Sequence, residues 1–171
     1  GCGKSTLLKI IFGVLKPKNA FIRINEKKYS KGYLSKKICY LPQHNFLPNY
    51  LTISTVIRLM VKDVSKQNAL LEQDDIIRKI RNQKVADLSG GERRYVELLL
   101  LLQQDADFYL LDEPFSGVAP HMQTHIQQII LNNSKTKGFI ISDHHYHTVL
   151  GIATRLVLLQ NGGCRKIESK K

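Results

Sequence analysis

Hydrophobic positions along this chain fall into short apolar bursts separated by stretches with helical spacing. Residues 108–111 and 139–141 are wholly apolar or aromatic, as expected for strands that are covered on both faces of a parallel sheet. A helical stretch at residues 121–131 lies between them, and neighbouring parallel strands are normally joined by a right-handed crossover. The pattern therefore predicts a buried parallel sheet with a helix packed on it.

The other segments continue this α/β order. Helical spacing of apolar positions, with a more polar stretch in the third case, predicts helices that begin near residues 7, 52, 74 and 92. Extended patterns predict strands at residues 21–24, 37–41 and 155–159, the last followed by a turn at 161–163 and a short returning strand. We therefore expect one α/β domain with a helical piece inserted at residues 44–87.

Composition narrows the class of protein. A chain of 171 residues with 43% hydrophobic and 23% charged residues is long enough for one well-buried domain. The longest apolar run, residues 96–102, is interrupted by Glu97 and is far shorter than the roughly 20 residues of a membrane span. Three cysteines without a framework spacing favour a reducing, cytoplasmic setting. The net charge of +12 suggests an anionic partner, but the lysines are dispersed and are not interleaved with aromatic residues, which favours a lysine-rich solvated surface.

The chain begins with the end of a phosphate-binding motif. The full pattern is G-x-x-x-x-G-K-[ST], and its last places match Gly3-Lys4-Ser5 within the string Gly1-Cys2-Gly3-Lys4-Ser5-Thr6. The first glycine of the pattern would lie upstream, so we expect the chain to be part of a longer protein. A helix that starts here would present its positive end to phosphate, although the same letters also fit a plain glycine turn.

A carboxylate pair follows the apolar strand at residues 108–111. Because ligands of open α/β sheets bind at the carboxyl ends of the strands, Asp112 is placed to hold Mg²⁺ beside the Ser5 hydroxyl. Glu113 points differently and can accept a proton from an attacking water. The alternative for this pair is an acidic helix cap after a core strand.

The string Leu88-Ser89-Gly90-Gly91-Glu92 precedes a long predicted helix. Its glycines allow close approach to the backbone, and the helix start offers N–H groups and a positive dipole end. A helix N-cap with a flexible entry is the alternative for this string alone.

The order of these three motifs resembles the ATP-binding cassette (ABC) family from end to end. The resemblance implies a P-loop NTPase with a RecA-like core at residues 1–43 and 88–171 and a helical subdomain at 44–87. It makes Gln43 the residue that senses Mg²⁺ and the attacking water, and His144 the residue that contacts the γ-phosphate. Residues 116–120 fall at the D-loop, where Ala119 replaces the usual aspartate. The residues in and around these motifs are most similar to those of ATPase subunits for lipopolysaccharide export and branched-chain amino-acid import.

The resemblance also implies the chemistry and the partners. The expected reaction is ATP hydrolysis that powers transport, with Glu113, His144 and Gln43 in catalysis and Mg²⁺ held by Ser5, Gln43 and Asp112. The nucleotide would be bound by Gly1 to Thr6 of one copy and by Ser89, Gly90, Gly91 and Glu92 of a second copy in a head-to-tail dimer. An integral membrane subunit would be the other partner, and the protein would lie on the cytoplasmic face of the membrane.

Three alternatives remain at this point. A soluble ABC ATPase acting on ribosomes or nucleic acid fits the charge and the LSGGE string. Such proteins resemble Asp-Glu-Pro-Thr-Asn-His after the strand, however, whereas this chain has Phe115, Ser116 and Gly117 in place of Thr-Asn-His. A cassette that binds without hydrolysing is the second alternative, and the intact Lys4, Asp112, Glu113 and His144 argue against it. A zinc site at residues 143–147 lacks a completing cysteine or grouped acid, so only His144 receives a role there.

Overall fold

The computed structural model describes residues 3–19, 21–160 and 162–167. Along the chain lie α1 (Lys4–Phe12), β1 (Ile22–Ile24), β2 (Lys27–Tyr29), the 3₁₀ helix η1 (Gly32–Ser35), β3 (Ile38–Leu41), α2 (Ile53–Met60), α3 (Val64–Gln73), α4 (Asp75–Ile80), the 3₁₀ helix η2 (Val85–Asp87), α5 (Gly90–Leu102), β4 (Phe108–Asp112), α6 (Pro120–Asn133), β5 (Gly138–Ser142), α7 (Tyr146–Ile152), β6 (Leu156–Gln160) and β7 (Gly163–Ile167).

The central sheet has the strand order β3-β4-β5, and both pairings are parallel. The register places Leu41 beside Leu111 and Asp112 beside Ser142. The middle strand β4 is almost wholly buried, which explains its uninterrupted apolar pattern. The predicted parallel sheet and its helical crossover are confirmed, and all three carboxyl ends lie along one edge.

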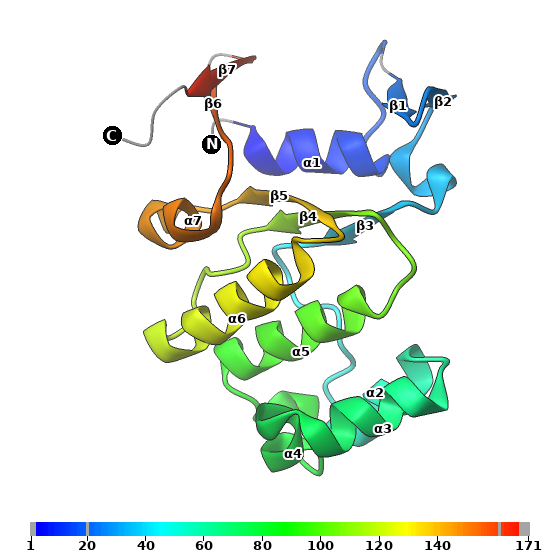
Figure 1. Ribbon diagram of the computed structural model, residues 1–171, viewed down its shortest axis with the longest axis vertical. Coiled ribbons are helices and arrows are strands. Elements are labelled where there is room, and N and C mark those ends of the chain that lie inside the picture. The colour runs from blue at the N-terminus through cyan, green and yellow to red at the C-terminus, as the bar shows by residue number, and fades with distance from the viewer. Residues whose placement is uncertain (1–2, 20, 161, 168–171) are drawn as a thin grey trace.

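Helices cover both faces of this sheet (Figure 1). Residues of β4 alternate between the faces: Leu110 belongs to the cluster that includes Leu8 of α1, whereas Tyr109 and Leu111 belong to the larger cluster that includes residues of α5 and α6. In Figure 1, α1 lies on one side of the sheet and α5 and α6 on the other. The sheet thus forms the middle layer, and it holds the end of β4 firmly between two packed layers.

Two small antiparallel hairpins complete the β structure. Strands β1 and β2 pair around Arg23 and Lys28, and β6 and β7 pair from Leu156 with Ile167 to Gln160 with Gly163. The returning strand predicted at the end of the chain is therefore present, and the small antiparallel part of the fold is confirmed. The short β2 was not predicted because two of its three residues are exposed lysines.

A block of helices, α2 to α4, lies between β3 and α5 in sequence and beyond α5 in space (Figure 1). Side chains begin these helices: Thr52 caps α2, Asp63 caps α3 and Asp74 caps α4 by accepting from backbone N–H groups. Apolar residues of α2 and α4 are buried, as their spacing predicts. Helix α3 was not predicted, because it is polar and buries only Leu71.

Two helix starts differ from the prediction. Helix α5 begins at Gly90 and not at Glu92, because Ser89 and Glu92 form a reciprocal capping box that fixes the first turn. Helix α1 begins at Lys4 and not at residue 7, directly after Gly3, whose φ of 88° lies in the left-handed region that favours glycine. Helix α5 thus includes Gly90 and Gly91, and α1 starts directly after Gly3.

Candidate nucleotide site at the carboxyl edge of the sheet

Asp112 ends β4 with a fully buried carboxylate that accepts hydrogen bonds from three hydroxyl groups. Ser5 Oγ of α1 lies 2.9 Å from Oδ1, and Ser142 Oγ of β5 lies 2.7 Å from the same oxygen. Tyr40 of β3 donates to Oδ2 at 3.0 Å. Burial and this bond to Asp112 raise the pKa of Tyr40, so its phenol stays a donor at neutral pH. The Asp112 side chain is thus bound by three hydroxyl groups and does not cap a helix.

Glu113 follows immediately and faces a different set of partners. Its φ of 51° lies in the left-handed region, which is uncommon for a residue with a side chain, and its N–H donates to Ser142 O at 2.7 Å. Gln43 Nε2 donates to Glu113 Oε2 at 2.8 Å, and His144 Nε2 lies 3.1 Å from Oε1. Backbone strain of this kind is found where neighbouring structure fixes a functional residue. The Glu113 carboxylate, which follows β4, therefore contacts one side chain that follows β3 and one that follows β5.

The start of α1 supplies the phosphate-binding features that the structure describes. Gly3 O accepts the N–H of Leu7, which begins the helix, and the N–H groups of Ser5 and Thr6 belong to the first turn, where helix geometry gives them no intrahelical acceptor. Gly1 and Cys2, also predicted to contact nucleotide, lie outside the described residues. The hydroxyl of Ser5 and the carboxylate of Asp112 are oxygen ligands of the kind that Mg²⁺ prefers, so the residues present fit that ion.

The Ser89-Gly90-Gly91-Glu92 segment has separate surroundings. Glu92 Oε2 accepts from Ser89 N–H at 2.9 Å and from Ser89 Oγ at 2.7 Å. Ser89 and Gly90 are exposed, whereas Gly91 is buried. A Cβ built on Gly91 would lie 2.9 Å from Met122 Cβ of α6, whereas one on Gly90 would lie 3.4 Å from its nearest neighbour, Gly117 O. Gly91 therefore allows α5 and α6 to approach closely, and Ser89 and Gly90 face outward.

Sequence reasoning missed two buried charges next to the site. Arg94 of α5 is 4% exposed and donates to the carbonyl oxygens of Asp112 and Glu113, and Glu97, one turn later, is fully buried and bonded to Arg94. The available signal was Glu97 itself, since an acid inside an otherwise apolar helical run needs a buried partner. Ser142 and Tyr40 were also missed, because each reads as an ordinary strand residue.

Asp143 connects two loops at the same edge. Its Oδ2 accepts the N–H of Phe115, and its Oδ1 accepts the N–H of His145, both at 2.8 Å. These bonds fix the backbone on either side of His144. The His144 side chain is 70% exposed and contacts Glu113. Within the described ranges, no three His, Cys, Asp or Glu side chains are grouped so as to hold a metal ion.

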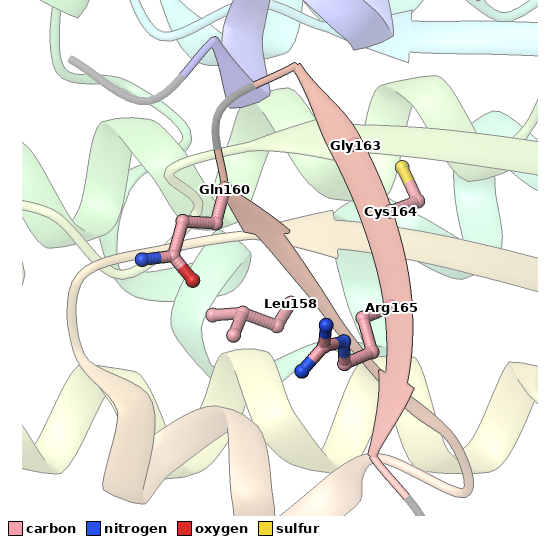
Figure 2. Close-up of a pocket in the computed structure, with 5 residues that line it drawn as sticks. All are labelled: Leu158, Gln160, Gly163, Cys164 and Arg165. Atoms are coloured by element: carbon pink, nitrogen blue, oxygen red, sulfur yellow. The ribbon is translucent and has the colours of Figure 1, made fainter.

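A pocket of about 340 Å³ lies on the β6–β7 hairpin (Figure 2) and is lined by Leu158, Gln160, Gly163, Cys164 and Arg165. Leu158 and Arg165 are cross-strand partners on one face of this hairpin. The next residue, Leu159, has the opposite orientation in a strand, and its Cδ2 is 3.9 Å from the Cβ position of Gly3. The hairpin thus places Leu159 close to the start of α1.

Known proteins have sequences similar to nearly the whole of this chain. Human retinal-specific phospholipid-transporting ATPase ABCA4 is 28% identical over 171 residues, which cover 95% of this chain and 8% of that protein. The lipopolysaccharide export system ATP-binding protein LptB of Acidithiobacillus ferridurans is 28% identical over 174 residues, covering 95% of this chain and 72% of that protein. The chain therefore spans a small part of the first relative and most of the second.

The fold also has a solved counterpart. The dimeric structure of a post-hydrolysis state of the ATP-binding cassette MJ0796 bound to ADP and Pi matches with a TM-score of 0.77 and 21% identity, covering 98% of this chain and 82% of that one. This similarity confirms the predicted P-loop NTPase fold with its mainly parallel sheet. No helix in the part of the chain that the structure describes is long and apolar enough to cross a membrane. Since the family model for the ABC transporter matches residues 1–116, which is more than half of the sequence, the chain belongs to the ABC transporter family.

Proposed function

We propose that this chain is the ATP-binding and ATP-hydrolysing part of an ABC transporter and powers transport through a membrane subunit. One observation carries the proposal: Gln43 and His144 both contact the Glu113 carboxylate, directly beside the Ser5–Asp112 pair. A carboxylate with two polar partners next to a hydroxyl–carboxylate pair provides a proton acceptor and a cation site at adjacent positions. Its location at the carboxyl edge of a parallel sheet supports nucleotide as the ligand.

Phosphate binding is assigned to the start of α1. The first-turn N–H groups of Ser5 and Thr6 and the positive end of the helix dipole favour the phosphate oxygens, and the Lys4 ammonium neutralises their charge. Mg²⁺, held by Ser5 and Asp112 with Gln43 nearby, would neutralise charge on the β- and γ-phosphates when bound. The hydroxyls of Ser142 and Tyr40 keep the Asp112 carboxylate in one orientation.

Hydrolysis is assigned to Glu113 with its two partners. A water oxygen attacks the γ-phosphorus, the bond from that phosphorus to the β–γ bridging oxygen breaks, and the Glu113 carboxylate takes the proton of the water. The Gln43 amide orients the carboxylate and the water, and His144 donates to the γ-phosphate oxygens. Most of the acceleration in such a site comes from position and electrostatics.

A second copy of the chain is proposed to complete the site. Ser89 and Gly90 are exposed at the start of α5, where a helix N-terminus can receive the phosphates of a nucleotide held by a partner. The capping box with Glu92 fixes the Ser89 backbone for that contact. The dimeric form of the structurally similar MJ0796 cassette supports this arrangement. Gly91 belongs to the same segment, and it also sets the distance between α5 and α6.

The organisation within the membrane system follows from the same proposal. We assign residues 1–43 and 88–171 to the catalytic core and residues 44–87 to a helical subdomain that receives the membrane subunit. The protein would therefore lie against the cytoplasmic face of the membrane. Names of relatives such as the lipopolysaccharide export ATP-binding protein support a transport role, whereas the transported substrate is determined by the membrane subunit.

Nucleotide binding and phosphate release by the full-length protein test this proposal. The wild type should bind ATP and release phosphate, and Lys4→Ala should lose both because the charge on the phosphates is no longer neutralised. Lys9→Ala is the matched control, since Lys9 lies in the last turn of the same helix, and it should leave both unchanged. A wild-type protein that neither binds ATP nor releases phosphate would contradict the proposal.

A further inference from the structure

The side chain of Arg94 is buried where three segments of the chain meet. Its Nη1 donates to Pro42 O at 2.7 Å, in the loop after β3. Its Nη2 donates to Asp112 O at 2.6 Å and to Glu113 O at 3.2 Å, at the end of β4. A single planar guanidinium on α5 therefore binds the backbone of both the Gln43 loop and the Glu113 turn.

Glu97 extends the same set of contacts. It is fully buried one turn after Arg94, and its Oε2 accepts from Arg94 Nη1 at 3.2 Å. Its other oxygen, Oε1, accepts the backbone N–H of Phe46 at 3.0 Å. Burial raises the pKa of Glu97, and the Phe46 N–H and Arg94 oppose that rise. Pro42 and Phe46 lie on either side of Gln43, so the pair holds both ends of the segment that carries it.

We propose that Arg94 and Glu97 are positioning residues that fix Gln43 and Glu113 relative to each other. The consequence for catalysis rests on the function proposed above. The 2.8 Å bond between Gln43 and Glu113 joins two loops, and it forms only while both backbones keep their relative places. Arg94 binds the two backbones directly, and Glu97 binds Arg94 and the far end of the Gln43 segment.

The geometry requires arginine at position 94. The guanidinium presents its donors in a rigid fork, whereas a lysine ammonium is a point charge on a flexible stem. Arg94→Lys therefore keeps the charge opposite Glu97 but cannot reach the carbonyls of both Pro42 and Glu113 at once. A buried pair that is hydrogen-bonded to the backbone around it favours one arrangement of those groups. The lysine variant loses that arrangement without leaving Glu97 unpaired.

Steady-state kinetics of the full-length protein test the catalytic consequence. We expect Arg94→Lys to lower kcat by about 10–100-fold, as small displacements of catalytic groups do, while KM for ATP and the affinity for ATP stay within about threefold. The matched control is Arg81→Lys, since Arg81 forms the exposed ion pair with Glu72. An unchanged kcat, or a loss of ATP affinity equal to the loss in kcat, would overturn the proposal. If Arg94→Lys does not fold, Arg94→Met combined with Glu97→Met removes both charges and is measured in the same way.

Amide hydrogen exchange tests the contacts without relying on ATP hydrolysis. In Glu97→Ala the N–H of Phe46 loses its acceptor, so we expect its exchange to become about tenfold faster or more. Glu72→Ala is the control and should leave that amide unchanged. Unaltered exchange at Phe46 in Glu97→Ala would overturn the positioning role. A wild-type protein without ATPase activity would instead contradict the proposed function, and the exchange result would still decide whether Glu97 holds the loop.

Discussion

Alanine at Gly91 and at its neighbour Gly90 distinguishes helix packing from nucleotide contact. A Cβ at position 91 would lie 2.9 Å from Met122 Cβ, 3.0 Å from Met122 Cγ and 3.3 Å from Val118 Cγ1, all on or next to α6. These distances force α5 and α6 apart, and overpacking of this kind costs about 1–3 kcal/mol. Helix propensity offsets at most about 1 kcal/mol of that cost. Taking the middle of that range, about 2 kcal/mol, and subtracting this offset, we expect Gly91→Ala to destabilise the protein by about 1–2 kcal/mol.

Gly90→Ala is the matched control for this prediction. Its Cβ would lie 3.4 Å from Gly117 O, an ordinary contact, with no closer neighbour. Thermal and urea unfolding of both variants are the assays, and the Gly91 variant should melt about 2–8 °C below the wild type, while the Gly90 variant stays at or above it. Equal stability of the two variants would refute the packing argument. Loss of ATP affinity in Gly91→Ala without loss of stability would indicate that Gly91 contacts the nucleotide and that its packing role is minor.

Three further predictions address the site and the core. Ser142→Ala removes the 2.7 Å bond to Asp112 and should cost about 1.5–3 kcal/mol of unfolding free energy; unchanged urea unfolding would contradict this. Ser89→Arg should stop phosphate release without weakening ATP binding to the monomer, and weaker monomer binding would count against a role in the partner's site. Burial raises the pKa of Tyr109 to about 12, so between about pH 10 and 12 the unfolded chain binds fewer protons and stability falls as pH rises. Tyr109→Phe should show a shallower fall in urea midpoints over that range, and an equal slope would refute it.

The sheet was predictable because burial on both faces leaves a direct mark on sequence. Uninterrupted apolar runs at β4 and β5 indicated covered parallel strands, and a carboxylate pair at the end of β4 indicated the functional edge. Helix α3 was not predictable from periodicity, since only Leu71 is buried and its start depends on the Asp63 cap. The local pattern of apolar residues therefore predicts the buried layers of the fold better than it predicts the polar helices at the surface.

The side chains around the acidic pair were predictable only in part. Motif order led to Gln43 and His144, and the structure brings both to Glu113. The contacts of Arg94 with the backbone of two other segments were not predictable, because they join residues 18 and 52 positions away whose identity matters little to a carbonyl contact. Bonds from a side chain to a distant backbone leave no pairwise pattern in one sequence, so such positioning residues emerge only from the folded structure.

Glu113 as the proton acceptor is the central claim of the proposed mechanism, and Glu113→Gln in the full-length protein tests it most directly. The amide keeps the size of the side chain but cannot take a proton from water. Binding and cleavage of radiolabelled ATP are measured on the same sample. We predict that the variant holds intact ATP with an affinity within about threefold of the wild type, while cleavage falls about 10²–10⁴-fold. Near wild-type cleavage of bound ATP by Glu113→Gln would contradict the mechanism.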